Sequence, residues 1–183
     1  MTHYDDSFYD DQSAGSLGSA QKVVPLVYEM YRPKTVVDVG CGIGTWASVF
    51  ESHGCEAVGV DGDYVSRDKI LVKNYIPIDI SERFSLDQRF DLAVCLEVAE
   101  HLSDARSWSF IFDLTRLSDV VLFSAATPGQ GGTNHINEQP LEYWQKMFEL
   151  YDYVMKDDVR PKIADLNGVE WWYKKNIVVF ERS

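Results

Sequence analysis

The sequence predicts an α/β fold in which a mostly parallel sheet is wound in both directions from its centre, with helices on both faces. Three observations support this. Short apolar runs rich in β-branched residues alternate with segments of helical periodicity, a pattern typical of parallel strands joined by helices. The first run leads into three glycines at alternate positions, as in the strand-to-helix turn of a nucleotide site. The 183 residues suffice for one domain with a sizeable core.

The first part of the chain predicts a helix, followed by a strand, a helix and a second strand. We expect the first helix over Ser19–Tyr31, with Pro25 in its first turn because proline is poorly tolerated inside a helix. Residues 1–18 are polar but contain three aromatic residues, so we expect this segment to pack on the protein rather than form a free tail. The next elements are a strand (Thr35–Val39), a helix (Gly44 to about His53) and a strand (Ala57–Val60).

The rest of the chain continues the alternation. The remaining predicted strands are Tyr75–Ile78, Phe90–Leu96, Val120–Ser124 and Ile177–Phe180. One helix is expected over about Asp104–Leu117, and another begins near Pro140, a residue favoured in the first turn of a helix. The helix that begins near Pro140 has apolar residues with a period of about 3.6, so it should bury one face.

The turn after the first strand predicts a nucleotide site. Gly40, Gly42 and Gly44 allow the backbone to turn sharply and to approach a ligand closely. Asp61 ends the second strand about twenty residues later, where a carboxylate can accept hydrogen bonds from both ribose hydroxyls. A glycine-rich turn without a ligand is the alternative, and Asp61 would then be an ordinary acid in an Asp-Gly-Asp turn.

Details of the turn indicate which nucleotide is bound. A dinucleotide fingerprint has its third glycine where this chain has Thr45, followed by the bulky Trp46, and this disfavours a nicotinamide-dependent oxidoreductase of the same layered fold. Asp38 precedes the first glycine by two residues, and a carboxylate there suits a ligand with a cationic amino acid end and no phosphate. The stretch TVVDVGCGIGTW therefore resembles motif I of class I methyltransferases that use S-adenosylmethionine (SAM).

Other stretches strengthen the resemblance. FDLAVCLEVAEHL (90–102) resembles motif IV of many small-molecule methyltransferases, and the start, the loop GQGGTNHINEQPLEYW (129–144) and the tail (157–176) are similar to small bacterial or phage-type proteins of the Methyltransf_23 family. The resemblance implies a Rossmann-like sheet of seven strands, SAM as cofactor and S-adenosylhomocysteine (SAH) as product. It also implies one methyltransferase domain over 1–183: a lid or helix segment (1–32), a SAM-binding core (33–126) and a substrate-side part (127–183).

The resemblance assigns roles to individual residues. Asp38 and the glycine turn would hold the methionine end of SAM, Asp61 the ribose, and Asp79 the adenine amino group. Glu97 would lie near the methionine end, and the N-terminal segment would close over the cofactor as a lid. The residues expected to contact the cofactor are Tyr9, Asp38, Gly40, Cys41, Gly42, Gly44, Thr45, Trp46, Asp61, Gly62, Asp79, Ile80 and Glu97.

The loop after the fifth strand is the expected substrate region, because polar loops on a rigid sheet commonly contact substrates. We predict that His135 is the general base that takes a proton from an acceptor hydroxyl, since imidazole titrates near working pH. A structural role for His135 is the alternative, as is a flexible connection in which Asn137 or Glu138 caps the next helix. Glu100 and His101 are expected to serve local structure, with a catalytic role for His101 left open.

Composition and missing motifs narrow the acceptor. The net charge is −12 and no basic run occurs, which argues against a nucleic-acid substrate because such binding depends on Lys and Arg. The amino-methylation motif Asn/Asp-Pro-Pro-aromatic is replaced by Leu-Glu-Val-Ala at 96–99. We therefore expect O-methylation of a small molecule, such as a sugar or similar metabolite. The alternatives are a non-catalytic SAM-binding regulatory subunit and a methyltransferase that acts on a macromolecule.

Other sequence features bear on location and metals. The three cysteines, Cys41, Cys55 and Cys95, are expected to be reduced thiols of a cytoplasmic protein. No membrane span and no signal peptide are expected. Neither a Cys/His cluster nor another ligand set of convincing spacing is found, so no metal ligand is predicted, and a metal-dependent variant is left open. The oligomeric state is left open.

Overall fold

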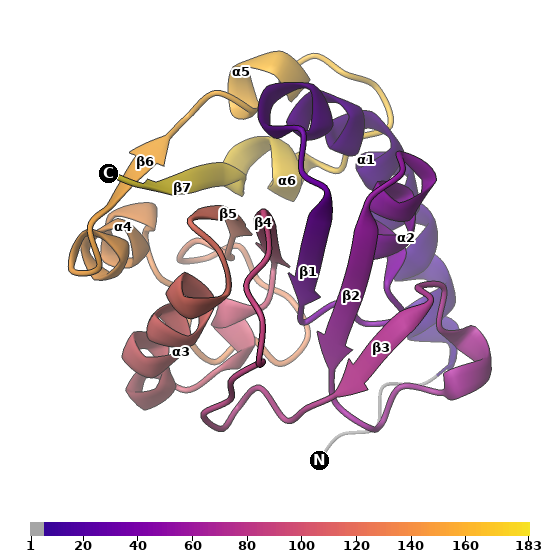
Figure 1. Ribbon diagram of the computed structural model, residues 1–183, viewed down its shortest axis with the longest axis horizontal. Coiled ribbons are helices and arrows are strands. Elements are labelled where there is room, and N and C mark those ends of the chain that lie inside the picture. Colours follow the sequence, from indigo (N-terminus) through magenta and orange to yellow (C-terminus); the bar gives the residue numbers. More distant parts are fainter. Residues whose placement is uncertain (1–5) are drawn as a thin grey trace.

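A single seven-stranded sheet forms the centre of the molecule. The structure is a computed structural model that describes residues 6–183, with side chains from residue 15 onward. The strands are β1 (Thr35–Val39), β2 (Glu56–Asp61), β3 (Asn74–Pro77), β4 (Leu92–Leu96), β5 (Val120–Ser124), β6 (Tyr153–Lys156) and β7 (Val178–Arg182). Their order is β3-β2-β1-β4-β5-β7-β6, and β7 alone runs antiparallel to its neighbours (Figure 1).

The order of the strands reverses between β1 and β4, which fixes where a ligand can bind. Strand β1 lies between β2 and β4, and Asp38 is in register with Gly59 on one side and with Val94 on the other. From β1 the chain builds outward first to β2 and β3 and then, on the other side, to β4 and β5. In open α/β sheets, ligands bind outside the carboxyl ends of the strands at such a reversal.

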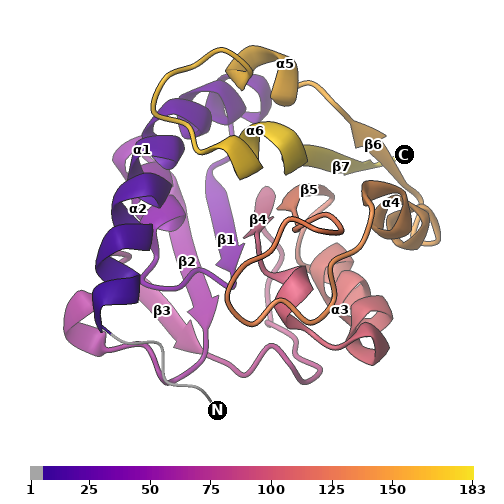
Figure 2. The same ribbon diagram turned by 180° about the vertical axis from the view of Figure 1, so that it is seen from behind.

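Helices cover both faces of the sheet (Figures 1 and 2). The helices are α1 (Asp6–Tyr31), α2 (Thr45–Ser52), α3 (Asp104–Leu117), α4 (Leu141–Glu149), α5 (Arg160–Ile163) and α6 (Trp171–Asn176), with short 3₁₀ turns η1 (Arg67–Lys69) and η2 (Ala99–His101). Successive residues of β1 point to opposite faces: Val36 joins the core under α1, α2 and α6, and Val37 joins the core under α3 and α4. Strands buried on both faces explain the continuous apolar runs in the sequence.

The predicted fold class is confirmed, with seven strands and helices on both faces, and each predicted strand is found within two residues of its expected bounds. The prediction for Pro25 was wrong: α1 begins at Asp6, so Pro25 lies in its interior. Proline removes one backbone hydrogen bond there, but Val23, Val24 and Val27 are fully buried, and their packing offsets this loss.

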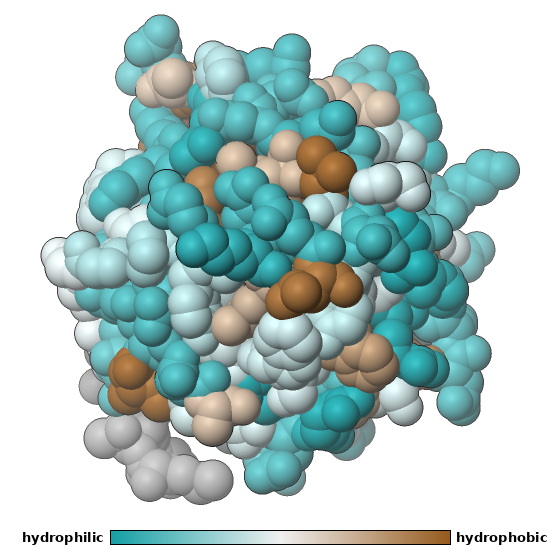
Figure 3. All heavy atoms as spheres, turned by 90° about the vertical axis from the view of Figure 1, so that its left-hand side faces the viewer, coloured by the Kyte–Doolittle hydropathy of each residue, from teal (hydrophilic) through white to brown (hydrophobic). Residues whose placement is uncertain are grey.

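Three short elements were not predicted, namely β6, α5 and α6. Strand β6 lies at the edge of the sheet, and its burial alternates although the hydrophobicity of Tyr-Val-Met-Lys does not. Figure 3 shows the side of the molecule that carries this edge: it is mostly hydrophilic, and hydrophobic residues are scattered over it singly or in small groups. In the part of the chain that the structure describes, the helices are too short or too polar to cross a membrane.

Candidate active site

A cavity of about 590 Å³ opens at the carboxyl ends of β1, β2 and β4. Its lining combines the turn after β1, the ends of β2 and β4, the loop after β5 and the start of α6. Figure 2 shows the segment after β5, coloured orange, beside the arrowhead of β1. The volume lies in the range of small-molecule sites. The cavity is therefore at the place that the strand order indicates.

Glycines shape the turn after β1 because other residues would not fit. Gly40 has a φ of 76°, and a Cβ there would lie 2.4 Å from a methyl group of Val98. Gly44 begins α2 with a φ of 82°, and a Cβ there would lie 2.7 Å from Val72. Gly40 and Gly42 line the cavity, whereas Gly44 does not. The structure therefore shows close packing at Gly44, and its predicted cofactor contact stays a prediction.

Asp61 connects β2 to this turn. Its Oδ2 accepts a hydrogen bond from the amide of Gly42 at 2.7 Å, and its Oδ1 accepts one from the amide of Gly62 at 2.7 Å. The hydroxyl of Tyr64 donates to the same Oδ1. Asp61 lines the cavity, whereas Gly62 does not. Asp61 ends β2 as expected, and the cofactor contacts of Asp61 and Gly62 stay predictions.

Asp38 is a buried carboxylate on the floor of the cavity, with 3% of its surface exposed. Burial is the main cause that raises the pKa of Asp38 to about 7, and the nearby charge of Asp61 adds to the rise. The amide of Ala47 donates to its Oδ2 at 3.2 Å and opposes the shift. A cationic group in the cavity would favour the ionised form of Asp38.

Segments from both ends of the chain complete the cofactor side of the cavity. Ser16 of α1 and Tyr173 of α6 line it together with Trp46, and the rings of Trp46 and Tyr173 meet edge to face at 5.1 Å. Thr45 and Cys41 also line the cavity, as predicted. The side chain of Tyr9, the other predicted contact from the N-terminal segment, lies outside the described residues, as does that of Gln12.

The loop after β3 brings Asp79 and Ile80 to the cavity wall. Asp79 is exposed, and its Oδ1 accepts hydrogen bonds from the amide of Ser81 at 3.0 Å and from its hydroxyl at 2.6 Å. These bonds make Asp79 a turn cap, while the family resemblance implies that it contacts the adenine amino group. The geometry of Asp79 is compatible with both, because one oxygen remains free of these bonds.

Glu97 lies at the end of β4 in a left-handed conformation, with a φ of 56°. The amide Nε2 of Gln130 donates to one carboxylate oxygen at 2.9 Å, and the amide Nδ2 of Asn176 donates to the other at 3.1 Å. A non-glycine residue in this region costs energy, so it persists only where surrounding contacts hold it. Glu97 thus joins β4, the loop after β5 and α6 at the cavity.

His135 lies in the loop after β5 and faces the cavity. Its Nδ1 lies 3.0 Å from Oε1 of Glu138, and Glu138 is itself fixed by the amides of Gly129 and Gly131 at 2.7 Å each. Glu138 therefore orients the imidazole and leaves Nε2 available. The alternative cap roles are not seen: Pro140 caps α4, and no side chain bonds to its end.

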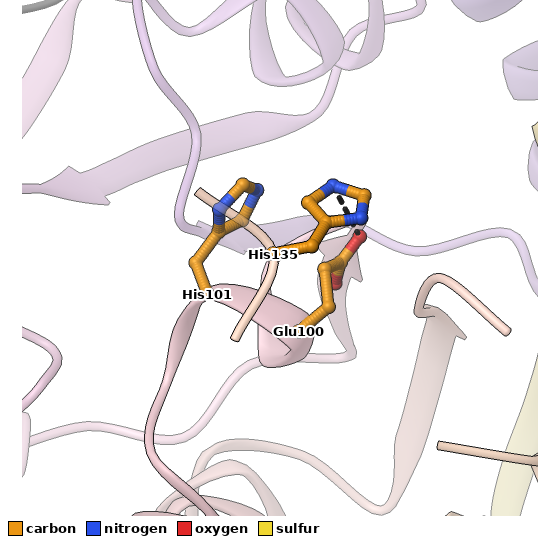
Figure 4. Close-up of side chains that lie close together, drawn as sticks. All are labelled: Glu100, His101 and His135. Carbon is orange, nitrogen blue, oxygen red and sulfur yellow. Dashed lines mark ion pairs between the residues drawn. The ribbon is translucent and has the colours of Figure 1, made fainter. Parts of the chain in front are cut away.

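Glu100, His101 and His135 converge in one cluster (Figure 4). Glu100 and His101 belong to η2, and His135 comes from the loop after β5. Nε2 of His135 lies 4.0 Å from Oε1 of Glu100, and the two imidazole rings meet edge to face at 4.9 Å. These are ligand types for a metal ion, and they come from two separate segments, so their spacing in the sequence did not indicate a ligand set.

Comparison with known proteins identifies the family. A model described as a methyltransferase domain matches residues 20–157. The chain belongs to this methyltransferase family. It is a class I domain of the kind that uses SAM, and its fold and cofactor are those expected from the sequence.

Curated relatives of this methyltransferase match only in part. A ubiquinone biosynthesis O-methyltransferase from Rhodopseudomonas palustris is 32% identical over 76 residues, which are 38% of this chain and 30% of that protein. One from Hydrogenovibrio crunogenus is 23% identical over 112 residues, which are 51% of this chain and 45% of that protein. The matched regions thus cover less than half the length of these two relatives.

Solved methyltransferases share the fold over the whole chain. The sugar N-methyltransferase KedS8 from Streptoalloteichus has a TM-score of 0.72 at 15% identity, covering 100% of this chain and 96% of that one. Magnesium protoporphyrin IX methyltransferase from Synechocystis, solved with bound SAH, has a TM-score of 0.64 at 15% identity, covering 100% and 90%. At these identities the likeness shows the fold alone.

The structure brings to the site residues to which the sequence assigned no specific role. Gln130, Asn176 and Tyr173 reach the cavity region from the loop after β5 and from α6, and Tyr64 reaches Asp61 from the loop after β2. Glu100 was expected to be structural, yet its carboxylate faces His135. The sequence shows Glu100 and His101 as neighbours and His135 in a polar loop. Only the folded structure brings these three side chains together.

Proposed function

We propose that this protein transfers a methyl group from SAM to a hydroxyl group of a small molecule. The observation on which this depends is a single cavity that joins the predicted cofactor residues to the loop after β5: Asp38 and Asp61 line one side, and Gln130 and His135 line the other. A cofactor and an acceptor bound in one cavity can be held in line, and positioning contributes much of the rate in such reactions.

The residues on the cofactor side fit SAM. The buried Asp38 accepts a hydrogen bond from the amide of Ala47 and favours a cationic amino end, and Asp61 offers two carboxylate oxygens to a ribose. When bound, SAM supplies an electrophilic methyl group on a sulfonium. Asp38 and Asp61 would fix the cofactor, and Trp46 and Tyr173 would exclude water from it. The methyl group would then point toward Glu97 and the loop after β5.

The acceptor side suits a small polar molecule. Trp171 is half exposed and lines the cavity with Trp172, so the rings offer flat apolar surfaces for a ring-shaped acceptor. Gln130 and Thr133 offer polar groups for hydroxyls, and His135 is proposed to act on the acceptor oxygen. The described lining contains no Lys or Arg, which disfavours phosphate-rich acceptors such as nucleic acid. The O-methyltransferase relatives support a hydroxyl acceptor.

An acceptor panel tests this proposal. The purified chain would be incubated with SAM carrying a labelled methyl group and with sugars, phenols, amines, RNA and protein. We expect labelled product with hydroxyl compounds. Methylation of RNA or protein alone would overturn the small-molecule acceptor, and methylation of amines alone would overturn the hydroxyl. SAM binding without transfer to any acceptor would favour a non-catalytic subunit.

A further inference from the structure

We propose that Glu100, His101 and His135 bind one divalent metal ion beside the acceptor part of the cavity. One ligand atom from each side chain lies within 4.8 Å of the others. Figure 4 shows the Glu100 carboxylate pointing toward the His135 ring, with the His101 ring beside the same space. An ion bound by nitrogen or oxygen at about 2.1 Å needs its ligands about 3–4 Å apart, so small side-chain movements would complete the site.

The state of Glu100 points to a missing cation. The residue is fully buried, and neither carboxylate oxygen makes a hydrogen bond of normal geometry. A buried carboxylate without a partner is costly, and such groups are normally paired with a cation or bound to a metal. Among the described residues, the one ion-pair contact of Glu100 is with His135 at 4.0 Å, and the cavity lining contains no Lys or Arg, so a bound cation would supply the missing charge.

The two histidines are held as metal ligands usually are. Nδ1 of His135 lies 3.0 Å from a Glu138 carboxylate oxygen, and Nδ1 of His101 lies 3.3 Å from the carbonyl oxygen of Asn134. Contacts of this kind fix the ring and leave Nε2 for the ion. The loop is also tied to the turn that carries Glu100, whose carbonyl oxygen accepts the amides of Ile136 and Asn137 at 3.0 Å each.

The ligand set indicates the kind of ion. Two imidazoles with one carboxylate suit Zn²⁺ or Mn²⁺ better than Ca²⁺, which prefers six or more oxygen ligands. Three protein ligands leave positions open for an acceptor oxygen. The ion would therefore bind the hydroxyl that is to be methylated, and His135 would act as a ligand rather than take the proton itself.

The role of the ion rests on the proposed function, and the chemistry balances as follows. The bound hydroxyl releases its proton to water, its oxygen forms a bond to the methyl carbon, and the carbon–sulfur bond breaks with its electron pair left on sulfur. A metal ion lowers the pKa of a bound hydroxyl, so more of the acceptor is present as the nucleophilic oxyanion.

Metal binding can be measured without any activity. The full chain would be stripped with EDTA, dialysed against Mn²⁺ or Zn²⁺, and analysed for bound metal. We expect one ion per chain, and at least about a hundredfold weaker binding in Glu100→Gln and in His135→Ala. His53→Ala is the control, because His53 lies at the end of α2, outside the cavity, and should leave metal binding unchanged. Failure to bind either ion at millimolar concentration, or equal binding by the variants, would overturn the site.

Thermal stability, measured with and without metal, distinguishes a variant that has lost the metal site from one that no longer folds. Without metal, Glu100→Gln should be at least as stable as the natural chain, because it removes a buried carboxylate. Metal should raise the melting temperature of the natural chain and of His53→Ala but not that of Glu100→Gln. A rise of the same size in Glu100→Gln would contradict the proposal. If metal binds but no hydroxyl compound is methylated, the proposed function fails and the metal site stands.

Discussion

Asp61 and Gly42 are nineteen residues apart, yet Oδ2 of Asp61 accepts the amide hydrogen of Gly42 at 2.7 Å. The bond joins the end of β2 to the turn after β1, so one carboxylate both supports the turn and lines the cavity. The proposed ribose contact and the shape of the glycine turn are therefore coupled.

The substitution Asp61→Ala should weaken SAM binding by about tenfold or more, since a hydrogen bond to a charged group contributes about 1.5–3 kcal/mol. It also leaves the amide of Gly42 without its partner, so some loss of stability is expected. Calorimetric titration with SAH measures the affinity. Asp63→Ala is the matched control, because Asp63 is an exposed neighbour and should change neither quantity. Unchanged affinity in Asp61→Ala would remove Asp61 from the ribose site.

Binding of SAH should depend on pH through Asp38. Because burial raises the pKa of Asp38 to about 7, the ligand-free carboxyl holds its proton below that value. A cationic amino end favours the carboxylate, so binding releases a proton and the affinity falls as the pH drops below about 7. Calorimetry between pH 5.5 and 8.5 should show this fall in the natural chain and a flatter profile in Asp38→Asn. The same slope in both proteins would exclude Asp38 as the cause.

Asp38 should also affect the stability of the ligand-free protein. Its pKa is raised on folding from 3.8 to about 7, so the unfolded chain ionises first as the pH rises. The folded state binds more protons in this range, and stability falls between about pH 4 and pH 7. Urea unfolding should show a smaller fall in Asp38→Asn. An identical fall would show that other groups cause it.

Gly44→Ala should destabilise the protein more than Gly54→Ala does. Both glycines have positive φ, 82° and 89°, so both substitutions cost about 1–2 kcal/mol for the left-handed conformation. At Gly44 the added Cβ also meets Val72 at 2.7 Å, whereas at Gly54 it meets nothing within 4 Å. Urea unfolding measures both. Equal losses would show that Val72 moves aside without cost.

The local features of the fold could be predicted from the sequence because they depend on nearby residues. Strand β1, the glycine turn and Asp61 follow from an apolar run, three glycines and an acid within 27 residues of chain, 35–61. Short edge elements such as β6 could not be predicted, because Tyr-Val-Met-Lys has neither a clear alternation nor a helical period.

The acceptor side was predicted less well, since it depends on contacts between distant parts of the chain. Glu97 is fixed by Gln130 and Asn176, which are 33 and 79 residues away. His135 was singled out for its chemistry, but its approach to Glu100 depends on how the loop after β5 folds back onto η2. No spacing in the sequence encodes this approach, so the cluster became visible only in the structure.

Arg106→Met should destabilise the protein by about 3 kcal/mol, the lower end for breaking a buried ion pair, because Arg83 still pairs with Asp113 at 3.0 Å. Arg106 lies 2.7 Å from the fully buried carboxylate of Asp113, and it also donates to the carbonyl oxygens of Ile80 and Glu82 in the loop that reaches the cavity. Arg32→Met is the control, since the pair of Arg32 with Glu29 is exposed and should contribute no more than about 1 kcal/mol. Similar losses in both variants, measured by urea unfolding, would contradict this ranking.

His135→Ala should lower turnover by about a hundredfold or more while leaving SAH binding within about twofold. The imidazole faces the acceptor side of the cavity, where it contacts Glu138, Glu100 and His101. Single-turnover rates with a hydroxyl acceptor and calorimetry with SAH separate the two effects. His53→Ala, on the far end of α2, should change neither. Because Glu138 holds Nδ1, Glu138→Gln should lower turnover less than His135→Ala does; a larger loss in Glu138→Gln would place the reacting group at Glu138.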